Sequence, residues 1–178
     1  MYDIIISEAI MEFEKVIKKR KSTRLFSNKK IEKEKLDKIL EAGRIAPTAK
    51  NIQPFKIYVI NSEEGIKKLD KATRCRYNAP TVLLICGDKE QAYQKGTFST
   101  YEMDSSIVAT HMMLEATNLG IDNIWIEWFD ENILKIEFNI PNNLVPVSLL
   151  PLGYKSKLCP PSPLHHIRKK IKDLVEYK

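Results

Sequence analysis

The sequence lacks the features that mark membrane, secreted or zinc-stabilised proteins. None of its apolar runs approaches the roughly 20 residues that span a bilayer, and its acidic amino-terminal segment does not resemble a secretion signal. The 3 cysteines, Cys75, Cys86 and Cys159, are widely spaced and form no CxxC pair, which argues against a disulfide framework and a structural zinc site. We therefore expect a cytoplasmic protein without a metal or a membrane partner.

Several catalytic signatures are also missing. There is no GxGxxG, GxxxxGK[ST], GxSxG or HExxH, so a Rossmann site, a Walker ATPase, an α/β-hydrolase and a zincin are unsupported. His111 lies in an apolar segment, which is more typical of a hydrogen-bonded core residue than of a catalyst. The adjacent His165 and His166 would point apart in an extended segment, so we do not expect them to bind a metal.

The chain does have an excess of positive charge. Its 178 residues include 29 Lys+Arg and 23 Asp+Glu, which gives a net charge of +6. Such a balance suits nucleic acid, anionic membranes or small phosphorylated ligands. Composition does not choose among them, because the basic runs around residues 18–21, 29–35 and 168–172 are equally typical of helix ends and solvated faces.

Helical and strand patterns alternate along the chain, which predicts one domain over residues 1–178. We expect helices at 10–19, 62–69, 104–119 and 130–138, and a further helix that has Glu32 and Glu34 in its first turn and runs to Gly43. We expect strands at 55–60, 80–86, 123–127 and 145–153. The apolar segment 104–119 should be the central buried helix, with Asp104 as its cap and Gly120 just past its end. The β-branched run at 80–86 should be a strand buried on both faces.

Two short segments could bind a ligand. In RKSTR, an extended backbone would point Arg20, Ser22 and Arg24 to one side, where two guanidiniums and a hydroxyl can meet a phosphate. In PTAKNIQPF, Asn51 and Gln53 carry amides that can read the edge of a heterocycle. Each signal is weak by itself, because basic helix ends are common and loop amides often satisfy only the backbone.

Order and spacing carry more information than any single motif. RKSTR, APTAKNIQPF, GIDNIWIEWFD, VPVSLLPLGY and the closing IRKK resemble, in sequence, the FMN-dependent nitroreductase family, from about Glu12 to Val175. The resemblance implies an α+β fold, a three-layer α/β/α sandwich with a small mixed central sheet. It also implies a homodimer with FMN sites at its interface. The apolar character of residues 107–119 independently favours packing against a second copy.

The resemblance implies a set of cofactor-binding residues. They are Arg20, Lys21, Ser22, Arg24, Asn51, Gln53, Glu127, Trp128 and Arg168. The basic cluster and the arginine of the tail would hold the FMN phosphate and ribityl chain, and the amide pair would lie near the isoalloxazine. Glu127 and Trp128 would lie beside its reactive face. Family members often have a small residue at the position of Trp128, whose indole could stack on the flavin, narrow the pocket or turn outward.

The implied activity is a two-electron reduction of nitroaromatics, quinones or related small molecules by NADH or NADPH, in a ping-pong mechanism. Because hydride transfer takes place on FMN, no catalytic side chain is needed. Alternatives are other flavin chemistry (dehalogenation, dehydrogenation or flavin breakdown), a flavin-binding module without turnover, and, least favoured, a nucleic-acid binder. A lid helix should be missing or reduced to residues 93–101, and the tail at about 159–178 should pack on the partner or the FMN phosphate.

Overall fold

The fold is built around a four-stranded sheet. A computed structural model describes residues 12–160 and 162–178. The strands, in the spatial order β1-β2-β6-β5, are β1 (Phe55–Ile60), β2 (Thr81–Asp88), β6 (Leu144–Gly153) and β5 (Asp122–Asn123). Neighbouring strands are antiparallel, and a parallel bridge between Ser22 and Asn123 joins the basic segment to the β5 edge. Among the described residues the four strands thus pair antiparallel, and this isolated bridge supplies the parallel pairing at the sheet edge.

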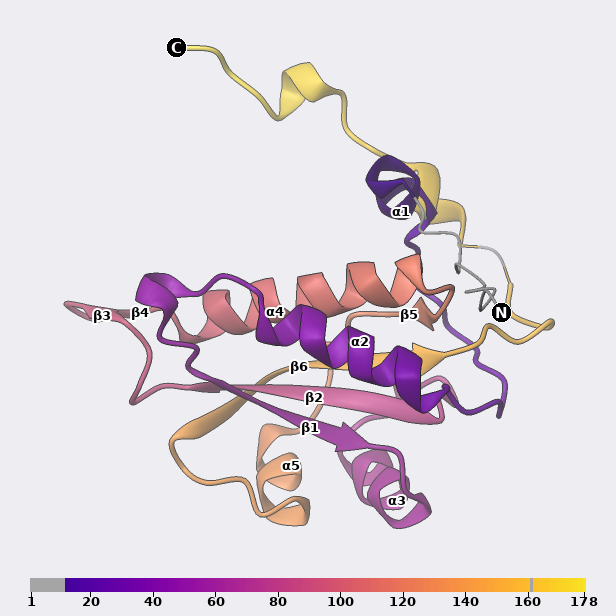
Figure 1. Cartoon of the computed structure of the whole chain (residues 1–178), viewed down its shortest axis with the longest axis horizontal. Coiled ribbons are helices and arrows are strands. Elements are labelled where there is room, and N and C mark those ends of the chain that lie inside the picture. The colour runs from indigo at the N-terminus through magenta and orange to yellow at the C-terminus, as the bar shows by residue number, and fades with distance from the viewer. Residues whose placement is uncertain (1–11, 161) are drawn as a thin grey trace, which may run out of the picture.

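Helices cover both faces of this sheet (Figure 1). α2 (Lys33–Arg44) and α4 (Tyr101–Asn118) cover one face, and α3 (Glu63–Ala72) and α5 (Glu131–Glu137) cover the other. α1 (Phe13–Lys19) contacts α4 and lies away from the sheet (Figure 1). Leu83 and Ile85 of β2 enter the core beneath α2 and α4, whereas Val82 and Leu84 enter the core beneath α3 and α5. Successive side chains of a strand point to opposite faces. The predicted three-layer α+β sandwich, with one strand buried on both faces, is confirmed.

The central helix α4 begins before its predicted cap. Thr100 is the N-cap, and Asp104 lies buried inside the first turn, so the prediction that Asp104 caps the helix is wrong. Its carboxylate accepts a hydrogen bond from Thr100 Oγ1 at 2.7 Å and from the backbone N–H of Ala49 at 2.9 Å. A carboxylate is favoured near the positive end of a helix whether or not it occupies the cap. Gly120 follows the helix with φ of +73°, as expected.

The remaining boundaries agree with the sequence to different degrees. The side chains of Ser62 and Asp130 accept from backbone N–H groups and cap α3 and α5. The strand expected at 123–127 is shorter, because β5 stops at Asn123 and Ile126 makes only an isolated bridge. The helix expected at 10–19 is α1, Phe13–Lys19. The first two residues of the expected range, 10 and 11, lie outside the described residues. His111 is only partly buried and, within the described residues, has no hydrogen-bond partner, contrary to the core role expected for it.

Short elements complete the chain. They are η1 (Ala49–Asn51), the hairpin β3 (Gln94–Lys95) and β4 (Phe98–Ser99), and the single turns η2 (Pro163–His166) and η3 (Ile171–Asp173). The hairpin occupies the place where a reduced lid was expected. After η2 the chain runs past α1 and ends away from the sandwich (Figure 1). No helix among residues 12–160 and 162–178 is both long and apolar enough to cross a membrane.

Candidate functional site

The basic segment after α1 is extended, and its side chains line two pockets, with Ser22 in the wall of both. Ser22 bridges to Asn123, and the backbone N–H of Thr23 donates to the Asn123 carbonyl at 3.0 Å. Arg20, Ser22 and Arg24 line one pocket, whereas Lys21 lines a different one. The structure therefore brings together the side chains at even positions, as the alternation of an extended strand requires, and places Lys21 on the other side.

The first pocket has a volume of about 140 Å³, and we call it the arginine pocket. Its lining residues are Arg20, Ser22, Arg24, Ser162, Leu164, His165 and Arg168. The tail supplies the last four of them. Nη1 of Arg168 donates to the carbonyl oxygens of Ile167 at 2.7 Å and Leu164 at 3.4 Å, which holds this guanidinium at the pocket. The arginine pocket thus brings together the basic segment and the tail, which are far apart in the sequence.

The arginine pocket concentrates positive charge. It has no acidic lining residue. Partial burial lowers the pKa of Arg20, and the nearby charge of Arg168 lowers this pKa further. The guanidinium of Arg20 nevertheless stays protonated at neutral pH, because an arginine pKa lies far above it. Like charges held together without a carboxylate are stabilised by an anion, and the guanidinium geometry suits the oxygens of a phosphate.

A loop between α3 and β2 links Arg24 to Trp128. Thr73 Oγ1 donates to the Trp128 carbonyl at 2.6 Å and accepts from the Cys75 backbone N–H at 3.0 Å. The Tyr77 ring lies next to Cys75 and Arg24: burial raises the pKa of its phenol, the thiol adds to that shift and the guanidinium opposes it. Sequence reasoning missed this loop, because it carries no motif beyond the turn residues before β2.

The segment around Trp128 faces solvent. Trp128 is 80 % exposed, so its indole does not pack into the core of its own chain. Glu127 is also exposed, and its carboxylate accepts from Trp125 Nε1 at 2.9 Å. Only the main chain of Trp128 is held, through the bond from Thr73. The indole is therefore available to contact a ligand or a second copy of the chain.

The predicted amide pair lies on a strained turn. Asn51 and Gln53 have φ of 55° and 57°, in the left-handed region that residues other than glycine seldom adopt. The backbone N–H of Gln53 donates to Thr48 Oγ1 at 2.9 Å, and its Nε2 donates to the Asn51 carbonyl at 3.1 Å. The Asn51 side chain remains exposed. Such strain at an exposed polar turn is typical of a binding site.

This turn and the arginine pocket lie at opposite ends of α4. The bond from Ala49 to Asp104 ties the turn to the first turn of the helix. At the other end, Ser22 bridges to Asn123, whose Nδ2 donates to Thr117 Oγ1 at 3.0 Å. At about 1.5 Å per residue, the helix between positions 104 and 117 is about 20 Å long. Within one chain, the structure does not bring Asn51 and Gln53 to the arginine pocket.

Comparison with known proteins gives the family. The model of the nitroreductase family matches residues 17–78 and 76–154, so this chain belongs to the nitroreductase family. A nitroreductase family protein from Clostridium difficile 630 is 41 % identical with a TM-score of 0.88, over 94 % of this chain and 99 % of that one. A curated protein from Archaeoglobus fulgidus, provisionally named an NADH dehydrogenase/NAD(P)H nitroreductase, is 31 % identical over 79 % of this chain and 83 % of its own length.

One solved relative contains the cofactor that the resemblance implies. A protein from Exiguobacterium sibiricum 255-15, provisionally named a nitroreductase, was solved in complex with FMN. It is 25 % identical to this chain and superimposes with a TM-score of 0.81, over 94 % of this chain and 98 % of that one. Within residues 12–160 and 162–178, no group of three or more His, Cys, Asp and Glu side chains is placed to hold a metal ion.

Proposed function

We propose that this protein is an FMN-dependent oxidoreductase that uses NADH or NADPH to reduce small acceptors such as nitroaromatics or quinones. The observation that carries the proposal is the arginine pocket, where Arg20, Arg24 and Arg168 lie around one cavity without a carboxylate in its lining. A phosphate dianion supplies the missing negative charge, and the hydroxyl of Ser22 adds a neutral donor. The residues of this chain therefore fit the FMN phosphate.

The remaining contacts follow from the position of this pocket. Bound FMN would supply the hydride and electron chemistry, which no side chain of the protein needs to perform. Arg24, next to the Tyr77 ring, would place a positive charge toward the pyrimidine end of the ring system, where it favours negative charge on the reduced cofactor. Thr73 would hold the main chain of Trp128, and Glu127 with it, at the edge of the site.

We also propose that each site needs two copies of the chain. Asn51 and Gln53 lie about 20 Å along α4 from the arginine pocket, by the rise of an α-helix, so the amide pair would serve the site of the partner. Exposed apolar side chains on the helices support association: Ile107 and Met103 of α4 are 38 % and 51 % exposed, and Phe13 and Ile17 of α1 are 66 % and 52 % exposed. We propose that residues 159–178 pack on the partner or at the FMN phosphate. We also propose that this tail belongs to the same single domain as the rest of residues 1–178.

Two measurements test the proposal. Purified protein should carry or take up FMN, with the absorbance of bound flavin, and should elute at twice the chain mass of 20.6 kDa in size-exclusion chromatography with light scattering. Under anaerobic conditions NADH or NADPH should bleach the flavin, and a nitroaromatic or a quinone should restore its colour. A colourless protein that ignores added FMN would refute the proposal. Flavin that binds but is not reduced by either nucleotide would favour a binding module.

A further inference from the structure

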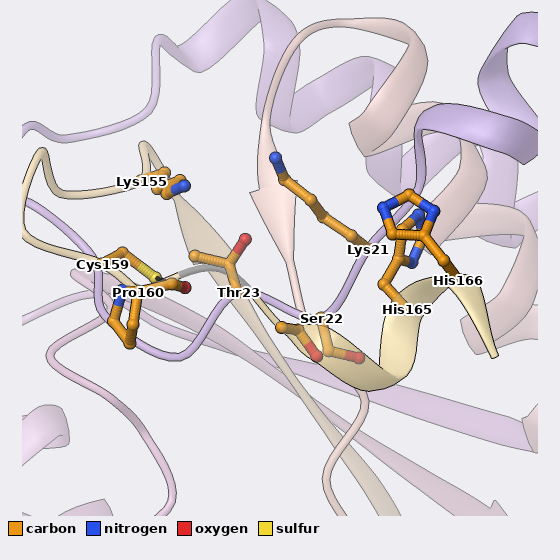
Figure 2. A pocket seen from close by; sticks show the side chains of 9 residues that line it. Lys21, Ser22, Thr23, Lys155, Cys159, Pro160, His165 and His166 are labelled. Atoms are coloured by element: carbon orange, nitrogen blue, oxygen red, sulfur yellow. Dashed lines mark hydrogen bonds between the residues drawn. The ribbon is translucent and has the colours of Figure 1, made fainter.

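A second pocket lies on the other side of the basic segment. It has a volume of about 130 Å³, and we call it the lysine pocket. Its lining residues are Lys21, Ser22, Thr23, Lys155, Cys159, Pro160, Ser162, His165 and His166. Figure 2 shows that Lys21 and Lys155 approach it from different segments, with Thr23 between them, the two histidines on one side and Cys159 on the other.

The charged groups of the lysine pocket have no internal counterion. Neither ammonium group, of Lys21 or of Lys155, has an ion-pair or hydrogen-bond partner within the described residues. The lining contains no carboxylate. The carboxylate of Asp122, next to it, is already engaged: Oδ1 accepts from Thr23 Oγ1 at 3.3 Å, and Oδ2 accepts from the Lys155 backbone N–H at 2.9 Å. Asp122 therefore positions Thr23 and the main chain of Lys155, but it does not line the pocket, whose charged lining side chains are the two lysines.

The neutral groups of the pocket add further donors. The hydroxyls of Ser22 and Ser162 make no hydrogen bond within the described part of the chain. The rings of His165 and His166 meet edge to face, with centroids 4.8 Å apart, and each can donate an N–H. Two ammonium groups repel a metal cation, and a small cavity that offers many donors favours an anion instead. It matches a compact ligand with several acceptor oxygens, which is the chemistry of a phosphoryl group.

The two pockets share one wall. Ser22, Ser162 and His165 line both of them, so groups bound in the two pockets would be neighbours. We propose that the lysine pocket binds a second phosphoryl group, adjacent to the one in the arginine pocket. Two ligands carry such a group: a flavin dinucleotide, through its second phosphate, and NADPH, through its 2′-phosphate. The positive charge of the lysine pocket does not depend on the proposed function. Only the choice of a flavin dinucleotide or NADPH as the source of the phosphoryl group rests on that function.

A substitution at Lys155 tests the proposal, because its side chain is exposed and only its backbone N–H is used by the fold. Lys157→Met is a matched control, because Lys157 is exposed on the same segment and lines neither pocket. The measurements are the Kd values of FMN and FAD by fluorescence quenching, the KM values of NADPH and NADH, and titration calorimetry with inorganic pyrophosphate.

Loss of one ammonium–phosphate interaction should weaken binding by about 10- to 100-fold. If the source is a flavin dinucleotide, Lys155→Met should weaken FAD binding by that factor relative to FMN. If the source is NADPH, the variant should raise the KM of NADPH relative to that of NADH. Pyrophosphate should bind the wild type and Lys157→Met more tightly than Lys155→Met. Lys21→Met, at the other lysine of the pocket, should show the same changes in affinity and KM as Lys155→Met.

The proposal fails if Lys155→Met and Lys157→Met agree within twofold in the FAD-to-FMN ratio, in the NADPH-to-NADH ratio and in pyrophosphate affinity. Failure of the proposed function gives a different pattern. A protein that binds neither flavin, but binds pyrophosphate in a manner that depends on Lys155, would refute the flavin function and support the lysine pocket.

Discussion

The substitution Arg168→Met tests how the arginine pocket works. Arg168 is exposed on the tail, so its replacement leaves the cores on both faces of the sheet intact. Burial lowers the pKa of Arg20, and the nearby positive charge of Arg168 lowers this pKa further, because two like charges that line one pocket repel each other in the absence of an anion. Removal of Arg168 therefore relieves repulsion in the protein without FMN, whereas in the protein with FMN it removes one partner of the phosphate.

Arg168→Met should therefore lower the affinity for FMN without lowering the stability of the FMN-free protein. One charge-assisted hydrogen bond to a phosphate contributes about 1.5–3 kcal/mol, and every 1.4 kcal/mol is about tenfold in affinity. We expect Arg168→Met to weaken FMN binding by about 10- to 150-fold, while the Tm of the protein without FMN stays the same or rises. The assay is fluorescence titration with FMN and with riboflavin, which lacks the phosphate. Thermal unfolding is followed with and without FMN.

The controls separate the phosphate contact from a general effect of the tail. Lys170→Met removes a positive charge from the same exposed tail at a residue that does not line the pocket, and should change FMN affinity by less than about twofold, as long-range charge effects are screened. Riboflavin affinity should not distinguish the three proteins. The reasoning is refuted if Arg168→Met weakens riboflavin as much as FMN, or if Lys170→Met matches Arg168→Met.

Three further predictions concern stability and access. The Tyr154 hydroxyl chiefly lowers the pKa of Glu32 from 4.5 to about 2, so the stabilisation is complete above pH 4.5 and is lost toward pH 2. Glu32→Gln should therefore cost less than about 1 kcal/mol at pH 6, since the pair is partly exposed, and progressively less as the pH falls toward and below 2; a pH-independent cost in urea unfolding would contradict this. Gly87→Ala would place Cβ 2.8 Å from the Tyr101 carbonyl oxygen, and the overpacking should cost about 1–3 kcal/mol, seen as a lower urea midpoint; an unchanged midpoint would show that α4 can move. Trp128→Ala, at an indole that is 80 % exposed, should change stability by less than about 0.5 kcal/mol but alter the KM of bulky acceptors, and unchanged acceptor kinetics would place the indole outside the site.

Local patterns in the sequence determined most of the elements. The β-branched run at 80–86 predicted a doubly buried strand, and β2 enters both cores. Ser62 and Asp130 predicted the starts of two helices because a cap depends only on a side chain and the backbone within one turn. The alternation of Arg20, Ser22 and Arg24 also needed only an extended backbone.

The tertiary structure decided which of these local features meet. Asp104 suits a cap by its sequence, yet it is buried because the turn at Ala49 packs on the start of α4 and needs an acceptor there. The same packing separates Asn51 from the arginine pocket by the length of the helix. The place of Lys21 depends on a wall that the tail supplies more than 130 residues later. Such contacts join segments that are distant along the chain, and the local periodicities and caps that a sequence displays contain no information about them.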